Sequence, residues 1–195
     1  MPIPRDFYNR DTRTVARELL GAILIRQMNG FHLRGRIVET EAYRPGDLAS
    51  HARRGNTPRC APMFEAPGFA YVYLTYGMHW MLNAVCEPEE QPAAVLIRAI
   101  EPLVGEDVMS QNRPGRPRKQ WTSGPAKLTQ AMAITSAQNR ADLTNNASDV
   151  WIEMGEAVAD GAVGNGPRIG MGTVPEPWFS MPWRWWVKDN PFVSR

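Results

Sequence analysis

Apolar and polar positions along the N-terminal part of the chain predict one helix followed by two strands. Apolar residues recur at helical spacing over 11–20, and Gly21 ends that pattern, so we expect a helix there. The short apolar run 22–27 is typical of a strand. Asn29-Gly30 is a strong turn signal, and a second strand starting near His32 would complete a β-hairpin.

The second strand leads into segment 38–51, which carries the most unusual polar pattern of the chain. Because alternate side chains of a strand share a face, one face would present Glu39, Glu41 and Tyr43. Like charges this close repel, which can raise the pKa of one carboxyl group and suit it to general-base catalysis. The alternative is an edge strand with a solvated acidic face, and this stretch alone favours that alternative.

A second hairpin is predicted over 69–83. Aliphatic residues alternate with tyrosines in its first strand, and Tyr76-Gly77 marks a tight turn. The tip would carry Tyr76, Met78 and His79. Tyrosines on a strand face usually serve packing, but apolar and aromatic residues on an exposed tip suit insertion between stacked bases.

Segment 93–101 has the apolar character of a buried strand, yet it contains Arg98. A buried arginine needs a carboxylate partner. The candidates are Glu39, Glu41 and Glu101. A core ion pair and a role in a functional site are equally open interpretations at this point.

Three places in the chain combine basic residues with turn formers or a helix start. Segment 44–68 reads as a long loop, and segment 108–120 contains prolines and glycines that predict a mobile basic loop without helix or strand. Both could rest on a phosphate backbone, and both could be plain solvated loops. The helix predicted to open at 123–127 could hold an anion. The basic residues that could meet phosphates are Arg53, Arg59, Arg113, Arg116, Arg118 and Lys127.

The C-terminal part is predicted to add short strands to the same domain. We expect a strand over 150–153, a glycine-rich turn and strand over 164–172, and a last strand with a closing turn over 178–195. No internal repeat or linker divides the chain, so its 195 residues most simply form one domain.

Composition narrows the class of protein. A hydrophobic content of 43% and a charged content of 22% are ordinary for a globular protein, and the net charge of +2 alone does not establish a nucleic-acid partner. The two cysteines and three histidines are scattered without metal-ligand spacing. With no secretory segment and no apolar run of membrane length, a reduced cytoplasmic protein without membrane association is expected.

Several of these motifs, in this order over nearly the whole chain, resemble the alkyladenine (3-methyladenine, N-methylpurine) DNA glycosylase family of monofunctional enzymes. Each motif alone is weak, but the set is specific. The matching segments are Gly35 to Tyr43 (GRIVETEAY), Thr57-Pro58-Arg59, Tyr71 to Asn83, Val95 to Pro102 (VLIRAIEP), Ser123 to Leu128 (SGPAKL), Pro167 to Gly170 (PRIG) and Asn190 to Ser194 (NPFVS).

The resemblance implies a role for each matching residue. Glu41 would be the general base that activates water for attack on the sugar C1′, and Arg98 would hold that water and the carboxylate. The residues implied to surround the flipped base are Tyr43, His51 and Tyr73, with Asn83 excluding normal guanine. The loop before His51 is one residue shorter than in the human enzyme, so its contact with the base could shift. The residues implied to enter the duplex are Tyr76, which fills the gap, and Met78 and His79, which flank it.

The resemblance also implies a fold and a reaction for the whole chain. The fold would be α+β, a single mixed domain over 1–195 with a curved antiparallel sheet, surrounding helices and a protruding hairpin that inserts into DNA. The reaction would be excision of 3-methyladenine, 7-methylguanine, hypoxanthine or ethenoadenine from double-stranded DNA during base excision repair. No metal, no cofactor and no lyase activity are implied, and the protein would be a monomer of the bacterial cytoplasm, associated with the nucleoid.

Two other classes of function stay open on the sequence. The chain could be a non-catalytic damaged-DNA-binding protein with the glycosylase fold, although Glu41 and Arg98 together argue against it. It could also share only its fold with formyltransferase-type nucleic-acid-binding domains, against which the Tyr76-Gly77-Met78 tip and Asn83 argue. An assay of binding to duplexes with and without a lesion would separate them.

Overall fold

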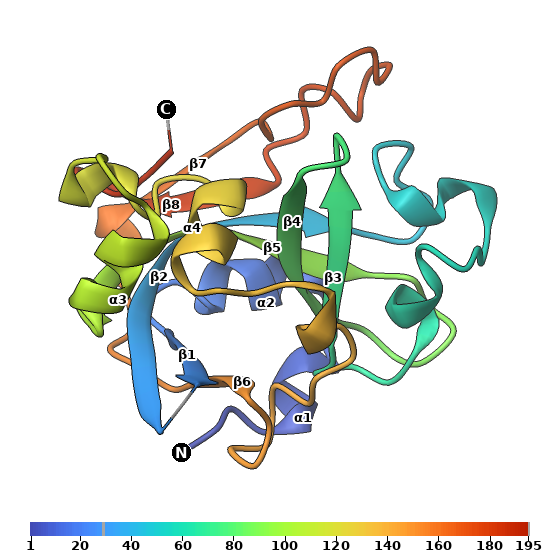
Figure 1. Ribbon diagram of the computed structural model, residues 1–195. Coiled ribbons are helices and arrows are strands. Elements are labelled where there is room, and N and C mark those ends of the chain that lie inside the picture. Colours follow the sequence, from blue (N-terminus) through green and yellow to red (C-terminus); the bar gives the residue numbers. More distant parts are fainter. Residues whose placement is uncertain (29, 195) are drawn as a thin grey trace.

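The computed structural model describes residues 1–28 and 30–194. Within these residues the chain forms helices and strands that build one domain (Figure 1). The α-helices are α1 (Arg5–Tyr8), α2 (Thr12–Glu18), α3 (Glu106–Asn112) and α4 (Pro125–Ala131). The strands are β1 (Ile23–Met28), β2 (Phe31–Tyr43), β3 (Ala70–Thr75), β4 (His79–Val85), β5 (Ala94–Val104), β6 (Val150–Glu153), β7 (Val163–Gly166) and β8 (Arg184–Val187). Short 3-10 turns are η1 (His51–Arg54), η2 (Ala61–Phe64), η3 (Arg118–Gln120), η4 (Ser136–Gln138) and η5 (Asp160–Ala162).

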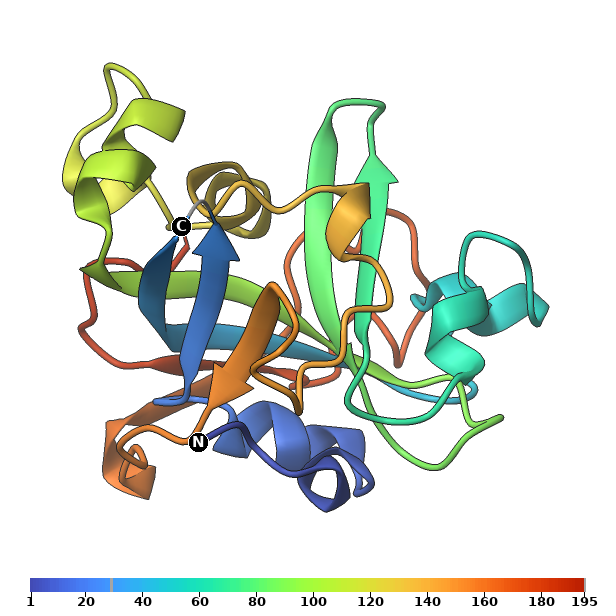
Figure 2. The same ribbon diagram turned by 60° about the horizontal axis from the view of Figure 1, so that its bottom comes forward.

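All the strands belong to one open antiparallel sheet whose centre is formed by the long strands β2 and β5. The order is β3-β4-β5-β2-β1-β6, and β8 pairs with both β2 and β7. β2 contacts β5 along one edge, while its other edge pairs first with β1 and then with β8. The views in Figures 1 and 2 show the strong twist of this sheet. The predicted α+β fold with a curved antiparallel sheet is confirmed.

Both predicted hairpins are present. β1 and β2 pair up to Met28 and Phe31, although Asn29 of the predicted turn lies outside the described residues. β3 and β4 pair up to Thr75 and His79, which leaves a three-residue turn with left-handed backbone at Tyr76 (φ 51°) and Gly77 (φ 68°). This second hairpin stands out from the body of the molecule in Figure 2.

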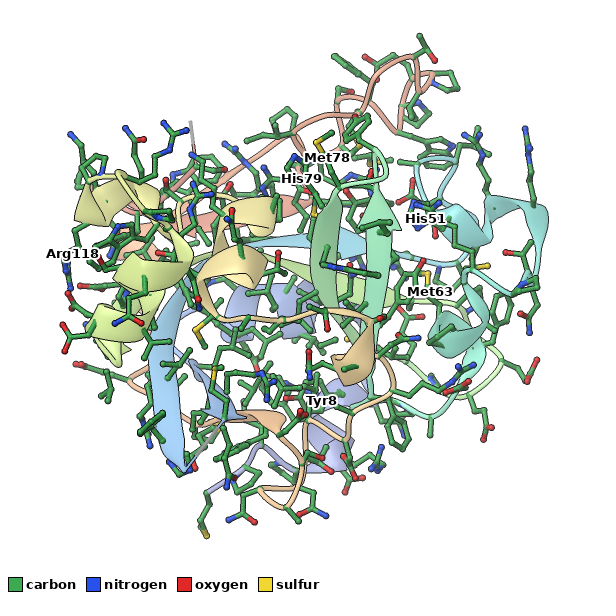
Figure 3. The ribbon with its side chains drawn as sticks, in the orientation of Figure 1. Tyr8, His51, Met63, Met78, His79 and Arg118 are labelled. Atoms are coloured by element: carbon green, nitrogen blue, oxygen red, sulfur yellow. The ribbon has the colours of Figure 1, made fainter. Side chains whose placement is uncertain are left out.

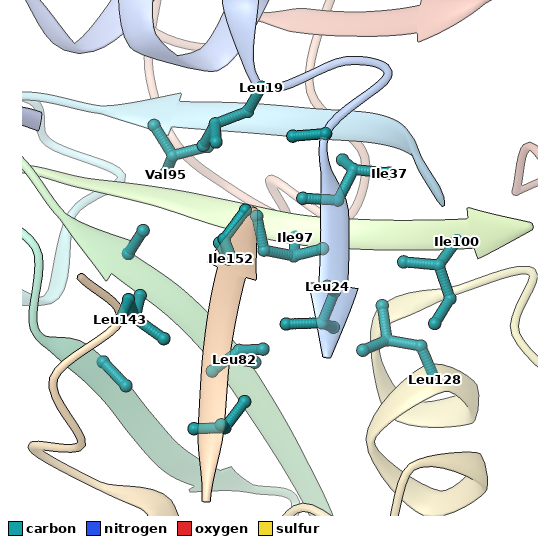
Figure 4. Close-up of a cluster of buried hydrophobic side chains, with 14 of the residues drawn as sticks. Leu19, Leu24, Ile37, Leu82, Val95, Ile97, Ile100, Leu128, Leu143 and Ile152 are labelled. Atoms are coloured by element: carbon teal, nitrogen blue, oxygen red, sulfur yellow. The ribbon is translucent and has the colours of Figure 1, made fainter. Parts of the chain in front are cut away.

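The core lies between the sheet and the helices that cover it. The Asp11 side chain accepts hydrogen bonds from the first turn of α2 and begins that helix. α2 then turns Val15, Ala16 and the following Leu19 toward the sheet, where they are fully buried. Leu128 of α4 packs on the same apolar cluster (Figure 4).

The prediction that segment 108–120 lacks helix is wrong at its start. α3 runs from Glu106 to Asn112 and buries Met109. Its first turn contains Glu106 and Asp107, whose negative charges favour a helix N-terminus. The helix ends before Pro114 and Gly115, so the turn formers do stop it, but only after two turns.

The C-terminal predictions are confirmed. β6 covers 150–153 as expected, β7 lies at the start of the glycine-rich stretch, and β8 is the last strand before a closing turn. The connection between β7 and β8 forms a long loop that reaches across the end of the sheet near the β3–β4 hairpin (Figure 1). None of the described helices is long and apolar enough to cross a membrane.

Candidate active site

A cavity of about 310 Å³ opens beside the β3–β4 hairpin. Its walls come from the end of β2, the loop that carries η1, strands β3 to β5, and segment 169–171 of the β7–β8 loop. Six predicted site residues lie in its lining: Tyr43, His51, Tyr73, Tyr76, Asn83 and Arg98. Residues spread over more than half of the chain therefore meet at one hollow.

Directly behind this cavity lie the two carboxylates of β2. The alternative of an edge strand with a solvated acidic face is wrong, because β2 is central and both Glu39 and Glu41 are fully buried. Arg98 bridges them, with Nε 3.1 Å from Glu39 Oε1 and one Nη 3.2 Å from Glu41 Oε1. Of the three carboxylates considered as partners, Glu101 instead contacts Arg36.

Irregular pairing between β2 and β5 accompanies this ion cluster. The register shifts on either side of the Glu39–Ala99 pair, so that Val38 on β2 and Arg98 on β5 each lack a directly paired residue. An extra residue in a strand bends it locally and can re-aim its side chain, and such bulges are common beside functional sites. Here the bulge residue Arg98 reaches both carboxylates.

The two carboxylates differ in how many donors they meet. Glu39 accepts hydrogen bonds from Arg98, Arg184 and both the backbone N–H and the hydroxyl of Ser194. This carboxylate thus ties the C-terminal segment to the sheet. Glu39 is therefore occupied by structural contacts. Glu41, whose partners Ile169 and Tyr43 line the cavity, is the carboxylate nearer the cavity wall.

Glu41 is held by three residues that line the cavity. Its Oε1 accepts the backbone N–H of Ile169 at 2.7 Å and contacts Arg98, while its Oε2 accepts the Tyr43 hydroxyl at 2.9 Å. Burial raises the pKa of Glu41 above its ordinary value, and the nearby Glu39 adds to this. Arg98 and the hydrogen bonds from Ile169 and Tyr43 act in the opposite direction by stabilising the anion.

Aromatic rings form one side of the cavity. His51 lies edge-on to Tyr73, with ring centroids 4.4 Å apart, and its Nδ1 is 2.9 Å from the Tyr71 hydroxyl. Burial, with the charges of Arg59 and Arg53, lowers the pKa of His51 to about 4, so the imidazole is neutral near pH 7. Tyr71 was not among the predicted site residues. The alternation that pairs it with Tyr73 on one face of β3 was the signal that could have found it.

Asn83 and the hairpin tip stand at two ends of the same hairpin. The Asn83 side-chain amide is buried and donates to the carbonyl of Tyr71 across β3 and β4. Tyr76 and Met78 at the tip are 85% and 70% exposed, and His79 is exposed as well. Figure 3 shows Met78 and His79 at the end of the hairpin and His51 on the neighbouring loop.

The six predicted phosphate-contacting residues fall into two groups. Arg53 and Arg59 lie on the loop beside the cavity, where Arg59 donates to the carbonyl of Leu74 and stacks over Tyr73. The others lie between the end of α3 and α4, where Figure 3 shows Arg118 on the far side from His51; α4 itself reaches the cavity through Pro125. In that second group, Arg116 is exposed, Arg118 is paired with Glu106, Arg113 donates to Gln130, and Lys127 donates to Ser123.

Ile169 is the main contributor to the site that sequence reasoning left without a role. The stretch Pro167 to Gly170 matched a family motif, but nothing in its composition placed it beside Glu41, which lies 128 positions earlier. Among the described residues, no group of three or more His, Cys, Asp or Glu side chains could hold a metal ion.

Comparison with known proteins gives one consistent result. Residues 6–191 match the model of the family described as methylpurine-DNA glycosylase. A relative from Carboxydothermus hydrogenoformans is 45% identical over 195 residues, covering all of both chains. Relatives from Chlorobium phaeobacteroides (45% over 198 residues, all of this chain and 98% of the relative) and Methanocella arvoryzae (48% over 198 residues, all of this chain and 97% of the relative) are similar. All three are provisionally named 3-methyladenine DNA glycosylases.

Proposed function

The chain belongs to the methylpurine-DNA glycosylase family and is a DNA glycosylase, and we propose that it excises damaged purines by hydrolysis with a water molecule activated by Glu41. The substrates would be duplex DNA containing 3-methyladenine, 7-methylguanine, hypoxanthine or ethenoadenine. The water oxygen attacks the sugar C1′, the bond from C1′ to the base nitrogen breaks, and the products are a free base and an abasic site. Every residue in this scheme comes from one chain, so a monomer would suffice.

The observation that carries this proposal is the environment of the Glu41 carboxylate. A carboxylate oxygen can accept about two hydrogen bonds. Oε1 meets two donors, from Ile169 and Arg98, whereas Oε2 meets only the Tyr43 hydroxyl among the described residues. Oε2 therefore has capacity for a water molecule. A buried carboxylate with a raised pKa is a stronger base than an exposed one, which suits it to take a proton from that water.

The charge of Glu41 would act on the sugar as well as on the water. Cleavage of a glycosidic bond passes through a transition state in which positive charge develops at C1′. A fixed carboxylate in a water-poor site stabilises that charge more than bulk water does. Arg98 keeps the carboxylate ionised and in place, so its role is to support Glu41 rather than to touch the leaving base.

The aromatic cavity supports recognition of cationic bases. Tyr43, Tyr71 and Tyr73 present electron-rich rings, and a positively charged methylpurine gains attraction to such rings that a neutral base does not. The neutral His51 adds no repulsion at pH 7. Cationic methylpurines also leave without prior protonation, so we expect faster release of 7-methylguanine than of hypoxanthine.

The exposed hairpin tip supports the step that brings the base into the cavity. A base inside a duplex must be turned out at a cost of about a few kcal/mol. Tyr76, 85% exposed at the tip and also part of the cavity lining, would fill the space that the base leaves. Arg53 and Arg59, on the adjacent loop, would contact the phosphates beside the lesion.

The test is release of free base from duplexes that each contain one lesion. Protein is incubated with 7-methylguanine, 3-methyladenine, hypoxanthine, ethenoadenine or undamaged duplexes, and the free base is identified by chromatography while abasic sites are counted by alkaline cleavage. Equal amounts of free base and abasic sites from damaged duplexes are expected. An identically prepared Glu41→Gln protein measures contaminating activity, and base release by both proteins alike would contradict the proposal.

A further inference from the structure

A fully buried ion pair between Asp47 and Arg168 joins the two loops that border the cavity. The guanidinium donates to both oxygens of the Asp47 carboxylate, at 3.1 Å for the Nη2–Oδ1 pair, and both side chains are shielded from solvent. Arg168 also donates to the carbonyls of Ala42, at 3.0 Å, and Trp178, at 3.2 Å. Neither member of the pair lines the cavity.

Several contacts of the pair lead to groups that line the cavity or hold Glu41. Ala42 separates Glu41 from Tyr43 in β2, and the guanidinium lies 4.7 Å from the centre of the Tyr43 ring. The residue after Arg168 is Ile169, whose N–H donates to Glu41. Asp47 also accepts the backbone N–H of Ala49, in the loop that leads to the aromatic wall.

Stability alone is a weak explanation for this arrangement. Removing two charges from water is costly, and buried ion pairs are often no more stabilising than apolar residues of similar volume. In addition, the Arg168 Nε is buried without a hydrogen-bond partner among the described residues, which adds to the cost. What the pair provides is a fixed orientation of the Arg168 side chain, because a planar guanidinium with several fixed acceptors can hold only one orientation.

We propose that the Asp47–Arg168 pair is a positioning device for base excision: it fixes the Ile169 N–H and the Tyr43 side chain against Glu41 and sets the distance between the two cavity loops. This inference rests on the proposed function. The pair acts on the reaction only through Ile169 and Tyr43, because it touches neither the cavity nor the Glu41 carboxylate.

The pair also bears on the ionisation of Glu41. The charged and titratable groups around Glu41 are Arg98 on β5, Glu39 and Tyr43 on β2, Tyr73 on β3, and Arg184 opposite it on β8. The hydrogen bonds from Ile169 and Tyr43 favour the anion. If the pair is removed, both donors lose their support, the pKa of Glu41 rises, and the base form is reached only at higher pH.

The test uses a double variant that removes both charges and keeps the volume, Asp47→Leu with Arg168→Met. Such a replacement of a buried pair commonly preserves folding. The control is Arg34→Met with Glu153→Leu, which removes another ion pair. Arg34 precedes Glu41 by seven residues along β2, so this pair lies about 23 Å from Glu41. Melting temperature and circular dichroism report folding, and single-turnover release of 7-methylguanine over a series of pH values reports the reaction. This lesion is already cationic, so base protonation adds no pH dependence of its own.

The folded double variant is expected to release the base about 10- to 100-fold more slowly, since small misplacements of reacting groups have effects of that size. At acidic pH the rate of release falls as Glu41 becomes protonated, and this acidic limb of the pH–rate profile should move to higher pH in the double variant. A purely structural role would not cause that shift. The control variant should change neither the rate nor the position of the limb. A folded double variant with wild-type rate and an unmoved limb overturns the inference. If the double variant does not fold, Arg168→Lys decides by the same two criteria, because it keeps the charge but not the bidentate contact. An inactive wild type overturns the proposed function and this inference with it, whereas an active wild type with an equally active variant overturns this inference alone.

Discussion

The hydrogen bond from Tyr43 to Glu41 gives the account its sharpest quantitative prediction. The Tyr43 hydroxyl donates to Oε2 at 2.9 Å and is the one donor that this oxygen meets among the described residues. Tyr43→Phe removes that donor and keeps the ring that would stack on the base. The ionised form of Glu41 then loses stabilisation, so its pKa rises further above the ordinary value.

The size of the effect follows from the kind of bond that is lost. A hydrogen bond to a charged group contributes about 1.5–3 kcal/mol. Because 1.36 kcal/mol corresponds to about a tenfold change in an equilibrium, the fraction of ionised Glu41 on the acidic limb should fall roughly 10- to 100-fold. Above the limb, Glu41 is ionised in both proteins and the rates should converge. The assay is single-turnover release of 7-methylguanine over a pH series.

Tyr73→Phe is the matched control, because it removes a hydroxyl from the same cavity without a hydrogen bond to Glu41. Its acidic limb should coincide with that of the wild type. If Tyr43→Phe lowers the rate equally at every pH, or leaves the limb in place, then the Tyr43 hydroxyl does not tune a catalytic carboxylate and the reasoning is wrong.

Three further predictions concern the tip, the cavity and the imidazole. Tyr76→Ala should weaken binding to a lesion-containing duplex by about 1–3 kcal/mol through lost stacking, as measured by fluorescence titration. The control Phe31→Ala, which removes a 58%-exposed ring from the other hairpin, should leave binding unchanged. Equal losses of affinity in the two variants would contradict the insertion of Tyr76 into the duplex. Asn83→Ala should increase the release of guanine from undamaged duplex. An unchanged rate of guanine release would show that Asn83 does not exclude normal guanine. The His51 pKa is lowered from 6.5 to about 4 in the folded protein, so the unfolded chain binds a proton first and stability falls as pH drops from about 6.5 toward 4. His51→Gln should make the fall in melting temperature over that window shallower, and an identical slope would show that His51 is not responsible.

Local patterns predicted much of the fold. The helix that follows residue 11, the two hairpins and the buried strand around Arg98 all follow from short-range rules and are present. The family resemblance read from the ordered motifs is confirmed by the match over residues 6–191.

The sequence named Glu39 and Glu41 as possible partners of Arg98, but it could not show that Arg98 meets both or that Arg184 joins them. The acidic stretch of β2 looked like a solvated edge because Glu39 and Glu41 are hydrophilic, and only the approach of Arg98 and Arg184 makes their burial tolerable. The N–H of Ile169 was equally hidden, since a backbone donor has no sequence signature and Ile169 lies 128 positions after Glu41 in the chain.

The most direct test of the central claim is the single-turnover rate of 7-methylguanine release by wild type and Glu41→Gln, measured together with the affinity of each protein for the lesion duplex. If Glu41 activates the attacking water, the variant should bind the duplex as well as wild type and release the base about 10²-fold or more slowly. A Glu41→Gln protein that binds equally well and releases the base at the wild-type rate would contradict the account.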